Sequence, residues 1–258
     1  MTKFFKNLYR LILIGTPLFI ISNYIRNFLP NYKTKKKSKK IENMIYKKFQ
    51  SVNYNEKWFC NNLNYLSNNF KNTKNVKDIL EVGSYEGASS CFIIEKLACD
   101  KEIELHCIDT WSGGIEHQPG GMAEADMAVV ELRFKHNINL AKQSVNHPVN
   151  MQVHKENSDI ALSHLLASGH VNTFDLIYID GSHQAADVLC DAVLGFRLLR
   201  DGGIMIFDDY FWQENLREGI DLLRCPKPAI DSFTNLYCRK LSILFASSHQ
   251  LFVQKNCA

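Results

Sequence analysis

The sequence has 258 residues, of which 46% are hydrophobic, which is enough for one sizeable α/β domain with an appendage. Its formal charge of +3 is unevenly distributed. Residues 1–40 contain ten lysines and arginines and no acidic residue, which leaves 20 basic and 27 acidic side chains in residues 41–258. This acidic balance excludes a broad electrostatic surface for nucleic acid on the main domain, so we expect no nucleic-acid partner.

The first 40 residues are expected to form an apolar and polybasic arm. Residues 11–22 are largely apolar, but this stretch is shorter than the roughly 20 residues of a membrane-spanning helix and contains Pro17. Six lysines follow within residues 33–40. This pattern is typical of a segment that lies on an anionic membrane surface. The alternative is an arm that packs on a partner subunit of a homo-oligomer.

The eight cysteines include no C-x-x-C pair, and several lie inside apolar runs. Buried cysteines of this kind behave as small hydrophobic residues and favour reduced thiols. We therefore expect a cytoplasmic protein, attached to the cytoplasmic face of a membrane if the arm binds lipid.

Residues 41–75 are expected to form two amphipathic helices that precede the main fold, residues 76–258. From residue 76, short apolar runs alternate with amphipathic segments. The expected strands are 78–82, 102–109, 150–156, 174–180 and 203–207, and the expected helices are 87–98, 123–142, 158–166 and 184–199. This alternation predicts a doubly wound, mostly parallel Rossmann-like α/β sheet. Residues 239–247 and 250–255 resemble a hairpin, so the last strand should be antiparallel.

The turn after the first expected strand is a candidate cofactor site, because open α/β sheets bind ligands outside the carboxyl ends of their strands. The stretch EVGSYEG contains Glu81 in the strand, Gly83 and Ser84 in the turn, and Gly87 at the start of the helix. The glycines allow a tight turn and a close approach to a ligand. A plain βα turn is the alternative, and the G-x-G-x-x-G of most dinucleotide-binding turns is absent.

Two further positions suit a nucleoside. Asp109 ends the second expected strand, where a carboxylate can accept hydrogen bonds from a ribose diol. Asn157 and Ser158 follow the third strand and could contact an adenine edge. Capping of a turn or helix is the alternative for each of them.

Asp180 and Asp208 end the fourth and fifth expected strands, and His183 and Asp209 lie beside them in sequence. Neighbouring parallel strands are about 4.8 Å apart, so these carboxylates should repel one another at one edge of the sheet. Mg²⁺ bound by the three aspartates would remove the repulsion and lower the pKa of a substrate hydroxyl. His183 is suited to act as the general base. The alternative is a set of loop caps and a surface histidine.

The stretches ILEVGSYEGASS, CIDTWSGGIEH and LIYIDGSHQAADVLCDAVLGFRLLRDGGIMIFDDY together resemble class I S-adenosylmethionine-dependent methyltransferases. The most similar branch contains macrocin-type sugar O-methyltransferases and cephalosporin hydroxylase-like proteins. The resemblance covers residues 76–256. It implies a cofactor loop at Glu81, Gly83 and Gly87, ribose binding by Asp109, Mg²⁺ on the three aspartates and His183 as base. Tyr85 departs from the wider pattern, which has a glycine there, and residues 1–40 match nothing in the family.

The sequence thus predicts a Mg²⁺-dependent O-methyltransferase that acts on a hydroxyl of a small molecule, a sugar or related natural product. Asp180 and His183 are the expected catalytic residues, with Asp180 also next to the cofactor. Residues 111–122, rich in glycine, are expected to form a mobile flap over the substrate. Two alternatives stay open: a nicotinamide-dependent oxidoreductase, and a membrane-tethered binding protein that keeps the fold without catalysis.

Overall fold

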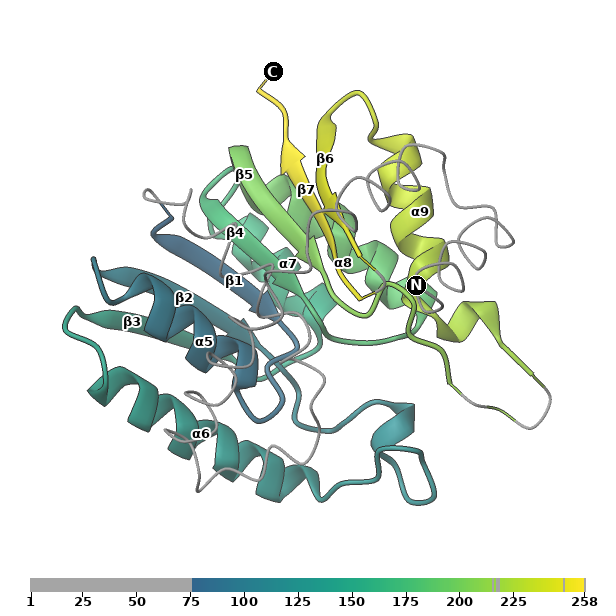
Figure 1. The fold of residues 1–258 in the computed structure, drawn as a ribbon, viewed down its shortest axis with the longest axis horizontal. Helices are drawn as coiled ribbons and strands as arrows, with labels where there is room; N and C mark the ends of the chain where they lie inside the picture. The colour runs from purple at the N-terminus through teal and green to yellow at the C-terminus, as the bar shows by residue number, and fades with distance from the viewer. Residues whose placement is uncertain (1–75, 215, 217–218, 248, 258) are drawn as a thin grey trace, which may run out of the picture.

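The computed structural model describes residues 76–214, 216, 219–247 and 249–257 (Figure 1). The expected arm (1–40) and the two expected helices before the main fold (41–75) lie outside the described residues, and so do the membrane contact and the subunit contact predicted for the arm. None of the helices in the described part of the chain is long and apolar enough to cross a bilayer.

One sheet runs through the described residues, with its strands in the order β3-β2-β1-β4-β5-β7-β6 (Figure 1). The strands are β1 (Asp78–Val82), β2 (Ile103–Ile108), β3 (Val149–His154), β4 (Phe174–Ile179), β5 (Leu199–Phe207), β6 (Leu241–Ala246) and β7 (Leu251–Lys255). The first five pair in parallel, and β7 pairs antiparallel with both β5 and β6. The expected mostly parallel sheet with a C-terminal antiparallel hairpin is confirmed.

Helices cover both faces of the sheet. Helices α7 (Ser158–Ala167), α8 (Ala185–Leu198) and α9 (Pro226–Leu236) share one buried apolar cluster with the sheet, and α5 (Ala88–Leu97) and α6 (Met127–Gln143) share the other. From β1 the chain adds β2 and then β3 on one side of the sheet, and it then returns to add β4 on the other side of β1. The direction in which strands are added therefore reverses between β1 and β4. Ligands of doubly wound sheets bind at this reversal, which positions the candidate site.

Helix α9 was not expected from the sequence. Its first turn contains Pro226 and Pro228, which favour a loop, but proline is tolerated at the first position of a helix because the N–H there has no intrahelical partner. The helix is amphipathic, with Ile230 and Phe233 fully buried against α8 and the sheet. Tertiary packing therefore outweighs the local preference for a turn.

Candidate active site

The turns after β1 and β4 lie against each other at the reversal point. Asp180 donates its backbone N–H to the carbonyl of Val82, and Gly83 donates to the carbonyl of Ile108, both at 2.8–2.9 Å. Gly83 has φ +85°, and a Cβ atom there would overlap the carbonyl oxygen of Asp180. Only glycine fits this position, because both the left-handed conformation and the close approach exclude a side chain. The expected tight turn is therefore present, and it joins the candidate cofactor turn to the turn that carries Asp180.

Glu81 is fully buried below this turn. Its Oε2 accepts hydrogen bonds from the hydroxyl of Ser84 at 2.7 Å, from the hydroxyl of Ser90 and from the thiol of Cys107 at 3.3 Å. Burial raises the pKa of Glu81, and the serine hydrogen bonds oppose this shift. Its Oε1 is a buried acceptor with no hydrogen-bond partner in the structure. Because buried polar atoms are normally paired, this oxygen fits a donor supplied by a bound cofactor.

Asp109 shapes the same turn from β2. Its Oδ2 accepts the backbone N–H groups of Ser84 and Tyr85 at 2.9 and 2.8 Å, and its Oδ1 accepts that of Trp111 at 2.7 Å. Tyr85 has φ +47°, and the hydrogen bond from its N–H to Asp109 helps hold this strained conformation. A carboxylate has about four acceptor positions, so Asp109 retains room for a ribose hydroxyl. Its cofactor role stays a prediction.

The residues expected near an adenine ring lie at the start of α7. Asn157 is the N-cap residue of this helix, but its side chain makes no capping hydrogen bond. The side-chain capping that was the alternative for Asn157 is therefore not observed. Ser158 is the first residue of α7 and is partly exposed. Adenine contact by these two residues stays a prediction.

Asp208 points into the protein. Its carboxylate is 7% exposed and accepts hydrogen bonds from the hydroxyl of Tyr178, from Gln250 Nε2 at 3.1 Å and from the backbone N–H of Asp209 at 2.8 Å. Burial, with the neighbouring charge of Asp209, raises the pKa of Asp208 to about 7. Asp180 lies beside them, and burial together with the charges of Asp208 and Asp209 raises its pKa well above the ordinary value. The three carboxylates therefore gather at one end of the sheet, as expected.

The Mg²⁺ role of these three aspartates stays a prediction. Within the described residues, no group of three or more histidine, cysteine, aspartate or glutamate side chains is placed to hold a metal ion. Two of the expected ligands make hydrogen bonds within the protein: Asp208 with Tyr178 and Gln250, and Asp209 with His183. The three carboxylates expected to bind Mg²⁺ therefore lie near one another, and two of them are hydrogen-bonded to protein side chains in this structure.

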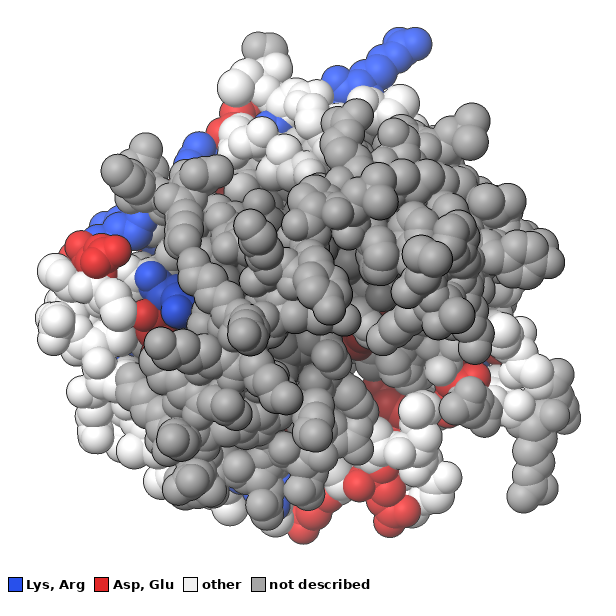
Figure 2. All heavy atoms as spheres, viewed as in Figure 1, with Lys and Arg blue, Asp and Glu red and all other residues white. Residues whose placement is uncertain are grey.

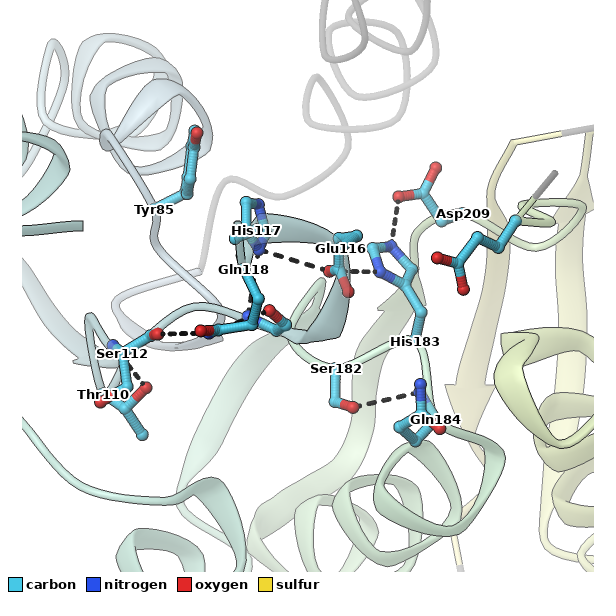
Figure 3. Close-up of polar contacts among 12 residues, drawn as sticks. Tyr85, Thr110, Ser112, Glu116, His117, Gln118, Ser182, His183, Gln184 and Asp209 are labelled. Atoms are coloured by element: carbon cyan, nitrogen blue, oxygen red, sulfur yellow. Dashed lines mark hydrogen bonds and ion pairs between the residues drawn. The ribbon is translucent and has the colours of Figure 1, made fainter. Parts of the chain in front are cut away.

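His183 is held at both ring nitrogens (Figure 3). Its Nε2 lies 3.1 Å from Asp209 Oδ2, and its Nδ1 lies 3.0 Å from Glu116 Oε1. Trp212 stacks on the ring with centroids 3.9 Å apart and an interplanar angle of 12°. Burial opposes the charged ring, but the two carboxylates outweigh it and raise the pKa of His183 to about 9. Burial likewise opposes ionisation of Glu116, yet the hydrogen bond to His183 lowers the pKa of this carboxyl to about 2.

Several contributors to this site were not predicted. Glu116, Trp212, Tyr178 and Gln250 all contact an expected site residue, and Pro226 and Ile230 of α9 line the hollow beside Asp180, His183 and Asp209. In the sequence, Glu116 could have been found as the single acidic residue of the glycine-rich stretch that follows β2. Acidic side chains lie at the lower right of the face in Figure 2, the side on which the segment between β2 and α6 lies in Figure 1.

The profile of a family described as "Methyltransferase domain" matches residues 80–210, half of the chain. The chain belongs to this methyltransferase family. This membership confirms the expected class and overturns the alternative of a nicotinamide-dependent oxidoreductase. The narrower resemblance, to sugar O-methyltransferases and cephalosporin hydroxylase-like proteins, stays a prediction.

The methyltransferase is 26% identical over 136 residues to "Probable caffeoyl-CoA O-methyltransferase 3" of Dictyostelium discoideum. The alignment covers 52% of this chain and 44% of the relative, so the chain spans less than half the length of that protein. Two solved structures share the fold with a TM-score of 0.50 and 16% identity. The first is an O-methyltransferase from Bacillus cereus in complex with SAH, and the match covers 74% of this chain and 79% of that protein. The second is cofactor-bound Rv0187 from MTB, for which the match covers 75% of this chain and 79% of that protein.

Proposed function

We propose that this methyltransferase transfers a methyl group from S-adenosylmethionine to a hydroxyl oxygen of a small molecule, a sugar or related natural product. The observation that carries the proposal is the contact between the turns after β1 and β4, where Gly83 lies against the backbone of Asp180. A cofactor in the first turn would therefore lie next to the titratable side chains of the second. The name of the Dictyostelium relative, a probable O-methyltransferase, supports oxygen as the acceptor atom.

The cofactor residues in this proposal lie at the carboxyl ends of β1, β2, β3 and β4. They are Glu81, Gly83, Ser84, Gly87, Asp109, Asn157, Ser158 and Asp180. The partnerless Oε1 of Glu81 is the feature of this structure that favours a bound donor group. The cofactor, when bound, supplies an activated methyl group, and the remaining work of the chain is to place the acceptor hydroxyl and remove its proton.

In this proposal His183 is the proton acceptor, and Asp180 beside it holds the acceptor hydroxyl. With both ring nitrogens facing carboxylates, His183 carries two protons at neutral pH, since its pKa is raised to about 9. It therefore accepts a proton only in the neutral fraction that grows as the pH approaches 9. Turnover should rise by about tenfold per pH unit below that value. A rate that is constant from pH 7 to 9 would contradict His183 as the proton acceptor.

The proposal is tested by expressing the chain and searching by mass spectrometry for small molecules that gain one methyl group. On the acceptor so identified, His183→Ala should lower turnover by roughly 10²–10⁴ while cofactor affinity stays nearly unchanged. Exposed His136 on α6 offers a matched control, because His136→Ala should leave turnover as in the wild type. If no acceptor gains a methyl group while S-adenosylmethionine still binds, the chain is a binding protein with the methyltransferase fold.

The Mg²⁺ requirement is a finer part of the proposal. It is supported by the mutual repulsion of Asp180, Asp208 and Asp209, which a divalent cation would relieve. Against it stands the hydrogen bonding of Asp208 to Tyr178 and Gln250, because an ion would have to displace these partners. Chelation with EDTA decides the question: loss of activity that Mg²⁺ restores supports the requirement, and full activity in excess EDTA removes it.

A further inference from the structure

The segment between β2 and α6 wraps around the side chain of Glu116. Glu116 lies in the 3₁₀ turn η3 (Ile115–His117) and is 6% exposed. A Cβ atom on Gly114 would collide with its carboxylate, and one on Gly121 would collide with its carbonyl oxygen. The backbone N–H of Ala123 donates to that same carbonyl at 2.9 Å. The glycines of this segment therefore allow the chain to close tightly around one buried acid.

The buried carboxylate faces a different turn of the protein. Glu116 Oε1 lies 3.0 Å from His183 Nδ1, while Asp209 holds the opposite nitrogen (Figure 3). His183 is thus fixed from two segments other than its own. The next residue, His117, packs its ring on that of Tyr85 in the candidate cofactor turn, with centroids 5.2 Å apart. One short segment therefore contacts both the cofactor turn and the proton-transfer histidine.

A buried carboxylate is stable only when it is paired, because removal of a partner from a buried ion pair leaves an uncompensated charge. Glu116 Oε1 has two imidazole partners, His183 at 3.0 Å and His117 of its own turn at 3.5 Å, and His183 is the partner that comes from another segment. His183 in turn keeps its orientation at Nδ1 only while this segment is docked. Docking of this segment and the orientation of the His183 ring therefore stabilise each other.

We infer that Glu116 is a positioning residue that couples docking of residues 111–126 over the reaction site to the orientation of His183. The ion pair between Glu116 and His183 therefore holds the flap expected from its glycines in place, so the flap does not move as a freely flexible loop. The inference rests on the proposed role of this site in methyl transfer. It names a residue that acts on the acceptor only through His183.

The experiment compares the full-length wild type with Glu116→Gln, which keeps the size of the side chain and loses its charge. Glu124→Gln is the matched control, because Glu124 is an exposed carboxylate close in sequence that accepts the backbone N–H of Gly120 at 2.9 Å. Three quantities are measured without cofactor or acceptor: hydrogen exchange of residues 112–122, modification of His183 by diethyl pyrocarbonate mapped by mass spectrometry, and the ring N–H signals of His183 in protein with ¹⁵N-labelled histidine.

In Glu116→Gln we expect exchange of the segment and modification of His183 to rise by about tenfold or more, with loss of the Nδ1–H signal. Glu124→Gln should match the wild type in all three. If Glu116→Gln leaves the exchange, the modification and the signal unchanged, the inference is wrong. Circular dichroism checks that each variant is folded, and His183→Gln provides a second route, because it should release the same segment even if Glu116→Gln does not fold.

These measurements are independent of methyl transfer. Failure to find an acceptor would leave their outcome unaffected, and failure of the latch would leave the methyltransferase proposal standing. Once an acceptor is known, Glu116→Gln should lower kcat more than it changes KM, because it displaces His183 without removing a substrate contact. A rise in KM alone would overturn the positioning role.

Discussion

Two buried acids of this methyltransferase differ in whether a partner neutralises them. Glu116 is paired with His183, and its carboxyl keeps a pKa of about 2. Asp191 on α8 is 1% exposed, and neither of its carboxylate oxygens makes a close hydrogen bond with the described residues. Burial raises the pKa of Asp191 from 3.8 to about 7; nearby Ser158 opposes the shift, and the charges of Asp187 and Asp159 add to it.

This contrast predicts that Asp191→Asn stabilises the protein at high pH. Because the folded-state pKa is raised, the stability that the protonated carboxyl contributes is present below pH 4 and is lost as the pH rises through 7. Above pH 7 the folded wild type bears a buried, unpaired charge that the amide lacks. The variant should therefore be more stable by on the order of 2–4 kcal/mol at pH 8 and not at pH 4.

Urea denaturation at pH 4, 6 and 8 measures the difference. Exposed Asp100, in the turn after α5, supplies the control, because Asp100→Asn should show no such pH-dependent gain. A difference between Asp191→Asn and wild type that is the same at all three pH values would contradict the argument.

At the scale of elements, α8 runs directly into β5 and needs a donor for its last carbonyl groups. Helix α8 ends at Leu198 and β5 begins at Leu199, so the chain has no residues for a glycine cap. Lys255 of β7 supplies the cap: its Nζ donates to the carbonyls of Phe196 at 3.1 Å and Leu199 at 2.7 Å, and to Asn172 Oδ1 at 2.7 Å. The last strand of the hairpin therefore secures the helix that carries the reaction turn at its other end.

Lys255→Met should lower the free energy of unfolding by about 1–3 kcal/mol. The methionine keeps much of the apolar stem but removes the donor to the carbonyls of Phe196 and Leu199, and it removes a cation from the negative end of the helix dipole. Chemical denaturation followed by circular dichroism gives the value. Lys240→Met, at an exposed lysine, should change it little. Equal midpoints for Lys255→Met and the wild type would show that the cap contributes nothing.

At the scale of the whole molecule, the charge is divided between an arm and a domain. We propose a boundary near residue 40 and a second near residue 75, with residues 41–75 as a helical extension and residues 76–258 as the methyltransferase domain. The excess of basic residues in 1–40 and of acidic residues in the remainder supports this division. A basic arm on an acidic domain favours contact of the arm with an anionic surface while the reaction site stays in water.

The arm is predicted to bring the protein to anionic membranes. Each lysine of residues 33–40 contributes on the order of 1 kcal/mol near an acidic lipid surface. The full chain should therefore float with vesicles that contain phosphatidylserine, and a chain that starts at Ile41 should not. Replacement of the six lysines by glutamine separates charge from the apolar stretch. Equal flotation of the full and shortened chains would exclude the arm as a membrane anchor and favour a contact between subunits.

The alternation of strands and helices, the closing hairpin and the acids at the ends of β4 and β5 could all be predicted from the sequence. These features follow from local hydrophobic periodicity and from the fact that parallel strands end at the same edge. Only the tertiary structure decided how those acids are used. Asp208 turns inward because the pairing of β5 with β4 and β7 brings Tyr178 and Gln250 to it. Glu116 and His183 are 67 residues apart and meet only when the segment after β2 folds back. Helix α9 forms because Ile230 and Phe233 are buried against α8, despite the two prolines in its first turn. Contacts between distant segments depend on packing, and local sequence carries no record of which partners packing will supply.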